Sequence, residues 1–199
     1  IASLLRNDNH NVSFIDLNGL DMGYDTLKDK IERTKPDAVL FRFTPTTFDH
    51  DMKTASIAKE LNSDIHTGGL CWTLHTLGSQ VMNEAPDLDA YITDEYEVAS
   101  PALINSWENG DNISPGAITK HGYGGNVEAI KDYDSLPLPA YDLLPNLDPY
   151  FVTAPAGQPF SILYTSKGCP FKCSFCTVAG TPLKMKSSQK IIEELRYLK

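Results

Sequence analysis

Three cysteines near the carboxyl end of the chain form the clearest chemical pattern in the sequence. Cys169, Cys173 and Cys176 make a C-x3-C-x2-C array, whereas the fourth cysteine, Cys71, lies far away along the chain. Cysteines this crowded cannot make a disulfide framework, and one thiol would be left over in any pairing. Thiolates are soft ligands that suit iron–sulfur clusters. The array therefore predicts a metal site in a protein of a reducing compartment.

The spacing of the array discriminates between kinds of metal site. Three thiolates can bind three irons of a 4Fe–4S cluster and leave the fourth iron open. An electron-transfer ferredoxin would use four cysteines with C-x2-C gaps, so the C-x3-C gap argues against that class. The alternative is a zinc site completed by Cys71 or a histidine, because zinc accepts mixed Cys and His ligands. Zinc sites favour paired cysteines with two-residue gaps, and we therefore prefer the iron–sulfur interpretation.

The array follows an apolar segment and precedes an amphipathic one. Residues 161–166 predict a strand, residues 167–180 a loop, and the segment from Ser187 or Ser188 onward a helix. We expect the apolar face of this helix to consist of Ile191, Ile192, Leu195 and Leu198. This is one βα unit, whereas a complete barrel of such units needs ~200 residues or more. We therefore expect residues 161–199 to be the start of an incomplete barrel domain.

Short apolar runs alternate with amphipathic stretches from residue 11 to about residue 110. The expected strands are residues 12–16, 37–43, 64–67 and 88–93. Two helices are expected to begin at residue 1 and at Asp25, the second with Leu27 and Ile31 on one face. Three more are expected over residues 49–61, along the helical spacing of Leu70, Leu74, Leu77 and Val81, and over 95–109 before Gly110. This alternation predicts an α/β domain with an open parallel sheet and helices on both faces. It would be Rossmann-like or flavodoxin-like, over residues 1–110, without its first strand.

Residues 111–160 have a different character. Glycines punctuate two short extended pieces that predict a hairpin, and the prolines of residues 134–145 favour an extended interdomain linker over a helix. The chain has no initiator methionine and opens within a helical pattern, so we expect both ends to be truncated.

The overall charge and hydropathy exclude several classes of function. The formal net charge of −9 argues against a nucleic-acid-binding surface, because such surfaces rest on clustered Lys and Arg. No apolar run approaches the ~20 residues that cross a bilayer. We therefore expect a cytoplasmic protein without a membrane span.

The cysteine segment resembles the cluster loop of the radical S-adenosylmethionine superfamily over residues 165–176, and residues 184–187 resemble the segment that opens its next helix. The resemblance implies a 4Fe–4S cluster on the three cysteines, with S-adenosylmethionine on the open iron and the backbone of Phe175 near its adenine. One electron would then cleave the sulfonium to give a 5′-deoxyadenosyl radical. It also implies a small metabolite substrate and a reductant such as flavodoxin or ferredoxin.

The whole chain resembles one branch of that superfamily, in which a cobalamin-binding domain precedes the radical barrel. The linker over residues 136–145, the segment 66–69 and the segment 43–47 are similar to its signatures. The resemblance implies cobalamin contacts at the carboxyl ends of parallel strands, from Gly68, Gly69, Thr44 and Thr46. It implies methyl transfer or rearrangement at an unactivated carbon, for which we expect this polypeptide alone to be insufficient.

Some positions depart from the pattern of that branch. Asp94-Glu95-Tyr96-Glu97 stands where the family has Gly-Glu-Gly-Glu, and Cys71-Trp72 stands where it has Pro-His. His66 fits a D-x-H-x-x-G axial-ligand pattern, which we expect to be accidental because that motif belongs after the first strand. Two alternatives stay open: a radical enzyme whose first domain binds no cobalamin, and a non-catalytic module stabilised by zinc or a cluster.

Overall fold

The computed structural model describes residues 1–74, 77–144, 162–176 and 178–198. The chain divides into two compact units. The sheet unit comprises Ile15–Ala129 together with Ile1, and the cysteine unit comprises Ala2–Phe14 together with Ile130–Lys199. The predicted boundaries at residues 110 and 160 stay predictions, whereas these units part between residues 129 and 130.

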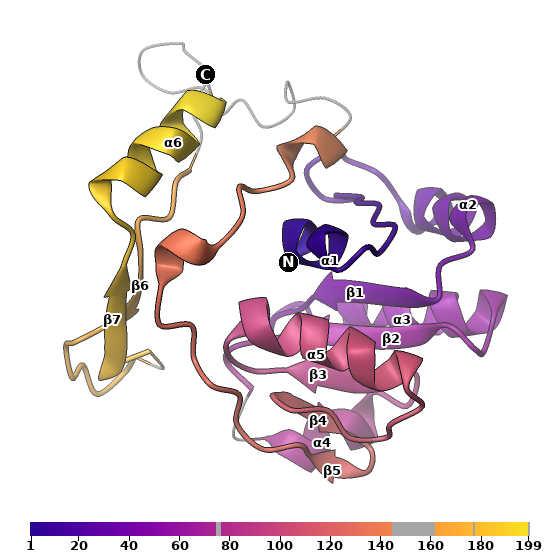
Figure 1. The fold of residues 1–199 in the computed structure, drawn as a ribbon. Coiled ribbons are helices and arrows are strands. Elements are labelled where there is room, and N and C mark those ends of the chain that lie inside the picture. The colour runs from indigo at the N-terminus through magenta and orange to yellow at the C-terminus, as the bar shows by residue number, and fades with distance from the viewer. Residues whose placement is uncertain (75–76, 145–161, 177, 199) are drawn as a thin grey trace. The chain divides into compact units, whose positions relative to one another are not determined.

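The sheet unit contains a five-stranded sheet in the order β1-β2-β3-β4-β5 (Figure 1). Its strands are β1 (Ala38–Arg42), β2 (His66–Leu70), β3 (Ala90–Ile92), β4 (Ala117–Thr119) and β5 (Gly122–Tyr123). The first three strands are parallel, whereas β4 and β5 run antiparallel to their neighbours. The predicted α/β class and the predicted hairpin are confirmed. The sheet is mixed instead of wholly parallel, because the hairpin pairs with β3 and extends the sheet.

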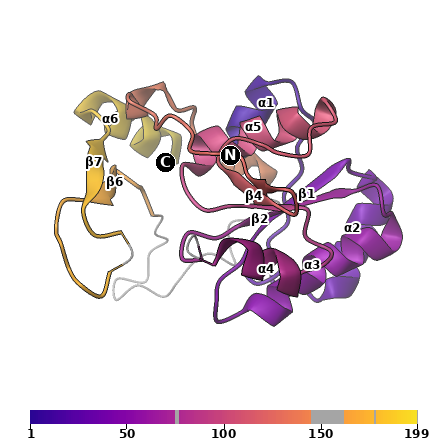
Figure 2. The ribbon, with the colours of Figure 1, turned by 90° about the horizontal axis from the view of Figure 1, so that it is seen from below.

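Helices cover both faces of this sheet (Figure 2). They are α2 (Tyr24–Thr34), α3 (Phe48–Leu61), α4 (Gly78–Glu84) and α5 (Tyr96–Glu108). Successive residues of a strand point to opposite faces, and β1 follows this rule. Leu40 packs in the cluster of α5, whereas Val39 packs in the cluster of α2 and α3.

The predicted helices at Asp25, at 49–61 and at 95–109 are confirmed within one or two residues. The helix expected along Leu70 to Val81 is shorter and begins only at Gly78, because Leu70 still belongs to β2 and Trp72–Leu74 form a bend and turn. The strand expected at 64–67 is displaced towards the carboxyl end, so that Gly68 and Gly69 lie inside it.

Residues 12–16 were expected to form a strand, and the structure contradicts this expectation. In a flavodoxin-like sheet with the order 2-1-3-4-5, the second strand pairs only with the first. No strand among the described residues stands beside β1 on that side. The segment therefore has no partner for its backbone hydrogen bonds.

The cysteine unit is built on a two-stranded antiparallel sheet and two helices. Its elements are α1 (Ala2–Asn7), the 3-10 turns η1 (Tyr133–Ser135) and η2 (Tyr141–Leu143), β6 (Ser166–Cys169), β7 (Thr181–Met185) and α6 (Ser188–Leu198). The helix α1 contacts the proline-rich segment: Ser3 Oγ donates to the Leu138 carbonyl at 2.6 Å, and Arg6 pairs with Asp142 at 2.7 Å. As predicted, residues 134–144 form no α-helix.

The strand expected at residues 161–166 is absent over most of the part of this segment that the structure describes. Ser161 lies outside the described residues, residues 162–165 are irregular, and β6 begins at Ser166. Residues 167–169 of the expected loop belong to β6, which pairs antiparallel with β7 directly after the loop. The helix at Ser188 is confirmed, but its predicted apolar face is not buried: Ile192 and Leu195 are exposed. Among the described helices, none is long and apolar enough to cross a membrane.

A polar network joins β2 to the segment before β3. Thr67 is fully buried, and its backbone N–H donates to Asp89 Oδ2 at 2.9 Å. The Asp89 backbone N–H donates in return to Thr67 Oγ1 at 3.1 Å, and Lys59 Nζ lies 2.7 Å from the Asp89 carboxylate. The carboxylate thus satisfies a buried donor and a half-buried cation at once.

Replacing Asp89 by Ala is expected to lower the free energy of unfolding by about 2–3 kcal/mol, since it leaves the buried Thr67 N–H without an acceptor. Urea unfolding followed by circular dichroism measures the loss. The exposed Asp64, which precedes the same strand, is the control, and its replacement by Ala should cost about 0.5 kcal/mol or less. Equal losses in the two variants would contradict the network.

Candidate metal centre

Gly168 sets the direction in which the chain leaves β6 for the cysteine loop. Its φ is +93°, and the pairing of β6 with β7 shifts register between Lys167 and Cys169. A Cβ at position 168 would lie 2.0 Å from the Pro182 carbonyl oxygen, so only glycine fits. Such a bulge bends the strand and re-aims the side chains next to it. The first cysteine of the array therefore follows a kink that glycine makes possible.

Backbone hydrogen bonds close the loop that carries the cysteines. The Cys169 N–H donates to Thr181 Oγ1 at 3.0 Å, and the Gly180 N–H donates to the Phe171 carbonyl at 2.8 Å. The Cys176 N–H donates to the Cys173 carbonyl at 3.2 Å, so the last two cysteines bracket one turn. The strand end and this turn bring the three cysteines onto one loop.

The thiols of the array are free, with Cys173 exposed and Cys169 and Cys176 half-buried. Within the described residues, no three His, Cys, Asp or Glu side chains are arranged as a ready ligand set for a metal. The donor chemistry nevertheless fits a soft metal, because three thiolates on one loop are what an iron–sulfur cluster requires. Binding would have to draw the three sulfurs together, which couples the metal to the ordering of the loop.

A buried ion pair fixes the helix that follows the hairpin, and the sequence patterns did not reveal it. Lys186 Nζ donates to both carboxylate oxygens of Glu194 at 2.6 and 2.7 Å, and the Glu194 side chain is only 2% exposed. Glu194 stands three residues after Ile191, on the face that the helical spacing assigns to apolar residues. The position of Glu194 on that face, eight residues after Lys186, is the sequence feature that could have indicated the pair. The pair ties the end of the hairpin to the middle of α6.

The start of α6 is tied to the proline-rich segment by a second contact that sequence analysis missed. Ser187 Oγ accepts the N–H of Lys190 at 3.1 Å, which is the hydrogen bond of an N-cap residue. The Ser187 N–H donates to Asp134 Oδ1 at 2.8 Å. Hydrogen bonds to Asp134 from the Ser187 side chain and then from its backbone N–H hold the pKa of this carboxyl below its ordinary value, with smaller contributions from Lys190 and Lys186.

The residues expected to contact cobalamin lie in the sheet unit, and the two glycines are buried there. Gly68 and Gly69 are inside β2, not beyond its end. A Cβ on Gly69 would lie 2.5 Å from the ring of Phe43, and a Cβ on Gly68 would lie 2.4 Å from Leu40. Neighbouring side chains thus fill the space that the missing side chains leave.

The threonine loop after β1 bonds to itself. Thr44 Oγ1 lies 2.9 Å from Thr46 Oγ1 and 2.8 Å from Thr47 Oγ1. Asp51, in the first turns of α3, accepts a hydrogen bond from Thr47 Oγ1 and one from the Thr44 N–H. The Thr44 and Thr46 hydroxyls, expected to face a cofactor, therefore bond within the loop, and Thr47 links the loop to the start of α3.

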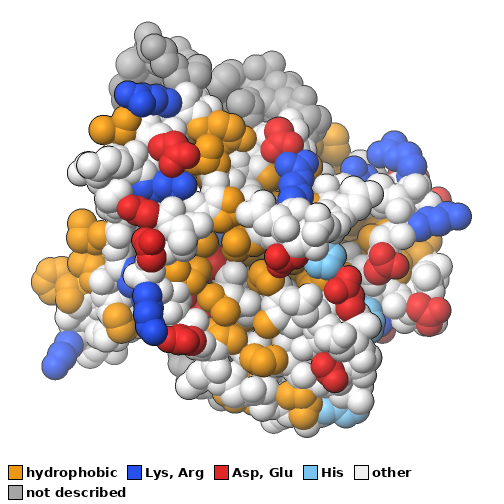
Figure 3. Space-filling view, in the orientation of Figure 1, with side chains coloured by type: hydrophobic (Ala, Val, Ile, Leu, Met, Phe, Trp, Pro, Cys, Tyr) orange, Lys and Arg blue, Asp and Glu red, His pale blue; other side chains and the backbone are white. Residues whose placement is uncertain are grey.

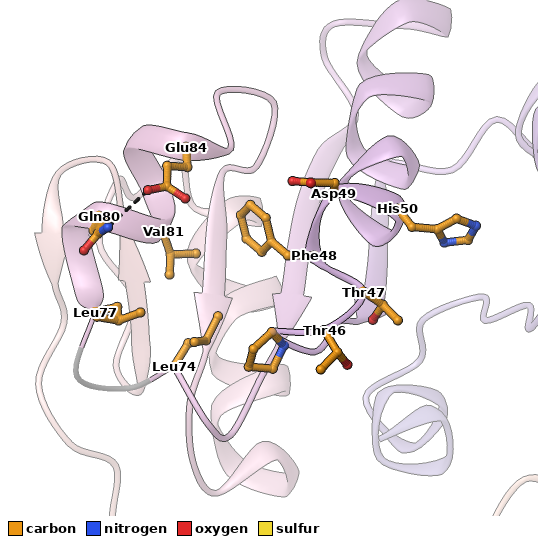
Figure 4. A pocket seen from close by; sticks show the side chains of 11 residues that line it. Thr46, Thr47, Phe48, Asp49, His50, Leu74, Leu77, Gln80, Val81 and Glu84 are labelled. Atoms are coloured by element: carbon orange, nitrogen blue, oxygen red, sulfur yellow. Dashed lines mark hydrogen bonds between the residues drawn. The ribbon is translucent and has the colours of Figure 1, made fainter.

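A pocket of about 480 Å³ lies beside this loop, between the start of α3 and α4 (Figure 4). Phe48 projects between the two helices, and Gln80 donates to the Glu84 carboxylate at 3.1 Å. Drug-sized ligands occupy pockets of about 300–1,000 Å³. The volume of this pocket falls within that range.

Two further candidate positions have structural explanations. His66 opens β2 at the amino end of the parallel strands, opposite to the edge where such sheets bind ligands. Its ring stacks on Trp107 with the centroids 4.8 Å apart and the planes at 7°. Glu95 lies after β3, at the carboxyl edge of the parallel strands, within the segment that departs from the family pattern. Its φ is +46° and it is buried.

The chain is similar to enzymes over most or all of its length. It is 30% identical to an uncharacterised methyltransferase of Pyrococcus horikoshii, over the whole chain and 44% of that protein. It is 28% identical to an anaerobic magnesium-protoporphyrin IX monomethyl ester cyclase of Rubrivivax gelatinosus, over 94% of the chain and 35% of the cyclase. It is also 28% identical to the hopanoid C-3 methylase of Methylococcus capsulatus, over the whole chain and 39% of that enzyme. The chain thus spans less than half of these relatives, and no family model matches it.

Replacing Glu194 by Ala is expected to lower the stability of α6 by about 3–5 kcal/mol, because Lys186 is left buried without its partner. Hydrogen exchange of the α6 amides measures the loss. Glu193 pairs with Lys190, and its side chain is 55% exposed. Replacing Glu193 by Ala should therefore lower the stability of α6 by about 1 kcal/mol or less. The double change Lys186→Met and Glu194→Leu should restore protection, and its failure to do so would argue against the ion pair as the cause.

The contact between Asp134 and Ser187 is expected to weaken in acid. A carboxyl whose pKa is lowered in the folded state stabilises that state above its ordinary pKa, and the stabilisation disappears as the pH falls through the lowered value. The amide proton shift of Ser187 should therefore move with pH at a value below the ordinary range of an aspartate. Asp134→Asn should abolish this movement. A titration of the Ser187 amide that persists in the variant would refute the assignment.

Proposed function

We propose that the chain belongs to a radical S-adenosylmethionine enzyme and provides its iron–sulfur ligands. The observation that supports this most directly is the set of three free thiols on one hydrogen-bonded loop, with the C-x3-C-x2-C spacing. The similarity to proteins named as methyltransferases, a methylase and a cyclase agrees with an enzyme of this kind.

In this proposal Cys169, Cys173 and Cys176 bind a 4Fe–4S cluster through their thiolates. When bound, the cluster supplies the electron that cleaves the sulfonium of S-adenosylmethionine into methionine and a 5′-deoxyadenosyl radical. The chain's own residues hold the loop in place: Gly168 provides the kink at its start, and the buried pair of Lys186 and Glu194 fixes the helix after it.

Aromatic side chains beside the cysteines are available for a ligand. Phe175 is 89% exposed and Phe171 is 70% exposed. The visible face of the hairpin of β6 and β7 carries a group of hydrophobic side chains (Figure 3). Exposed apolar surface of this kind marks binding sites in soluble proteins. We assign the backbone of Phe175 to the adenine side of the S-adenosylmethionine site.

The reaction we propose is methyl transfer to, or rearrangement of, an unactivated carbon in a small metabolite, in the cytoplasm. The names of the relatives favour carbon-centred chemistry of this kind, since one is a hopanoid methylase and another a protoporphyrin ester cyclase. A one-electron donor such as flavodoxin or ferredoxin would reduce the cluster. Cobalamin would be the methyl carrier that the resemblance implies, but Phe43 and Leu40 occupy the space beside the glycine pair. We therefore favour the form of the enzyme without cobalamin in this domain.

Anaerobic reconstitution of the chain with iron and sulfide tests the proposal. We expect an absorbance near ~400 nm, the region of sulfur-ligated iron clusters, and about four irons per chain. After reduction with dithionite, S-adenosylmethionine should alter the electron paramagnetic resonance spectrum, because one iron is open to it. Each change of Cys169, Cys173 or Cys176 to Ala should remove most of the absorbance.

Cys71 provides the matched control for these variants. It is a free cysteine that is buried in the sheet unit, with Sγ 3.6 Å from Thr73 Oγ1. Cys71→Ala should therefore retain the cluster. Loss of the cluster in this variant, or stoichiometric zinc without the absorbance, would favour the zinc-stabilised binding module instead.

A further inference from the structure

We infer that the sheet unit binds no corrinoid, because aromatic and aliphatic side chains of its own fill the space over the glycine pair of β2. The sheet unit is distinct from the unit that carries the cluster loop, so the radical chemistry proposed for that loop does not depend on it. The inference gives the glycines a packing role and removes the reason to expect a cofactor next to them.

The ring of Phe43 packs against the backbone of Gly69, where a side chain would otherwise lie. A Cβ at position 69 would meet Phe43 Cε1 at 2.5 Å, Phe43 Cδ1 at 3.0 Å and Tyr91 Cβ at 3.3 Å. The Phe43 ring is itself packed edge-on against the rings of Tyr91 and Phe48, with centroids 6.0 and 5.9 Å apart. Phe43 is 1% exposed and Tyr91 is fully buried. A ligand approaching the backbone of Gly69 would have to displace this aromatic cluster.

Gly68 has the same role on the opposite face of the sheet. A Cβ there would lie 2.4 Å from Leu40 Cδ2 and 3.0 Å from the far edge of the Trp107 ring. Leu103 is the next neighbour, at 3.5 Å. The absence of a side chain at position 68 therefore allows α5 to pack closely on β2. Both glycines are explained by protein contacts, one on each face.

The first residues beyond the carboxyl ends of the parallel strands, where open α/β sheets bind their ligands, are buried. The residues that follow β1, β2 and β3 are Phe43, Cys71 and Thr93, and they are 1%, 2% and 9% exposed. Tyr91 contacts residues after β2, since its hydroxyl lies 3.2 Å from the carbonyl oxygens of both Leu74 and Gly78.

The phenol of Tyr91 stays protonated in this position. Burial raises the pKa of Tyr91 to about 12, and the nearby Cys71 thiol adds to the shift. The hydroxyl is therefore a hydrogen-bond donor at neutral pH and can serve the carbonyls it touches.

The first experiment uses the complete chain and hydroxocobalamin as the probe. The chain is incubated with an excess of hydroxocobalamin and separated by gel filtration, and the visible absorbance of the protein peak is recorded. We expect no corrinoid in that peak, whether or not the iron–sulfur cluster has been reconstituted. About one corrinoid per chain would overturn the inference and leave the cluster assignment unaffected, since the two are read at different wavelengths and by iron content.

The second experiment tests the packing role without any cofactor. Gly69→Ala should lower the melting temperature by several degrees, because the new methyl group overlaps the Phe43 ring. Phe43→Val removes both ring atoms that the methyl group would meet. The loss in the double variant should therefore be smaller than the sum of the losses in Gly69→Ala and Phe43→Val. Strictly additive losses would overturn the inference, because they would mean that the methyl group and the ring do not meet.

Gly23→Ala is the matched control for this cycle. Gly23 precedes α2 in the same unit with a φ of −86°, and a Cβ there would meet nothing within 4 Å. Its replacement should leave the melting temperature nearly unchanged. A loss equal to that of Gly69→Ala would mean that the effect belongs to glycine in general, and it would overturn the role assigned to Phe43.

Discussion

The close contact between β2 and its neighbours is the constraint on which the sheet unit depends. Glycine has no side chain, so a strand with two adjacent glycines allows close approach on both of its faces at once. In β2 those approaches are made by Phe43 on one face and by Leu40 and Trp107 on the other. Protein interiors are packed so densely that a single methyl group is felt. The positions of α5 and of the aromatic cluster therefore follow from Gly68 and Gly69.

The cysteine unit depends on a different kind of contact. Its hairpin is short, and its hydrophobic side chains are largely exposed, so burial contributes little to its order. Polar contacts take over this role: the pair of Lys186 and Glu194, the N-cap at Ser187 and the carboxylate of Asp134. Buried ion pairs are strongly destabilising when one partner is removed. They hold the strand and helix that flank the cysteine loop, and the loop itself retains the freedom to close on a metal.

Patterns that act over a few residues predicted much of this structure. Helical spacing located α2, α3 and α5, and the cysteine spacing located the candidate metal loop without reference to the fold. Pairings between distant segments were not predictable in this way: the sheet gained β4 and β5, and residues 12–16 found no strand to pair with. The glycine pair shows a further limit. A missing Cβ looks the same in sequence whether a cofactor or a phenylalanine ring fills its place, and only the distances separate the two.

Aromatic side chains have opposite roles in the two units, and this contrast bears on where a ligand can bind. In the sheet unit Phe43 and Tyr91 are buried, and they fill the space beside Gly69. In the cysteine unit Phe171 and Phe175 are exposed beside three free thiols. Burying an exposed phenylalanine ring gains roughly 1.5–3 kcal/mol, and Phe171 and Phe175 offer this gain at the cysteine loop. These two exposed rings favour ligand binding at the cysteine loop, whereas Phe43 and Tyr91 belong to the packed core of the sheet unit.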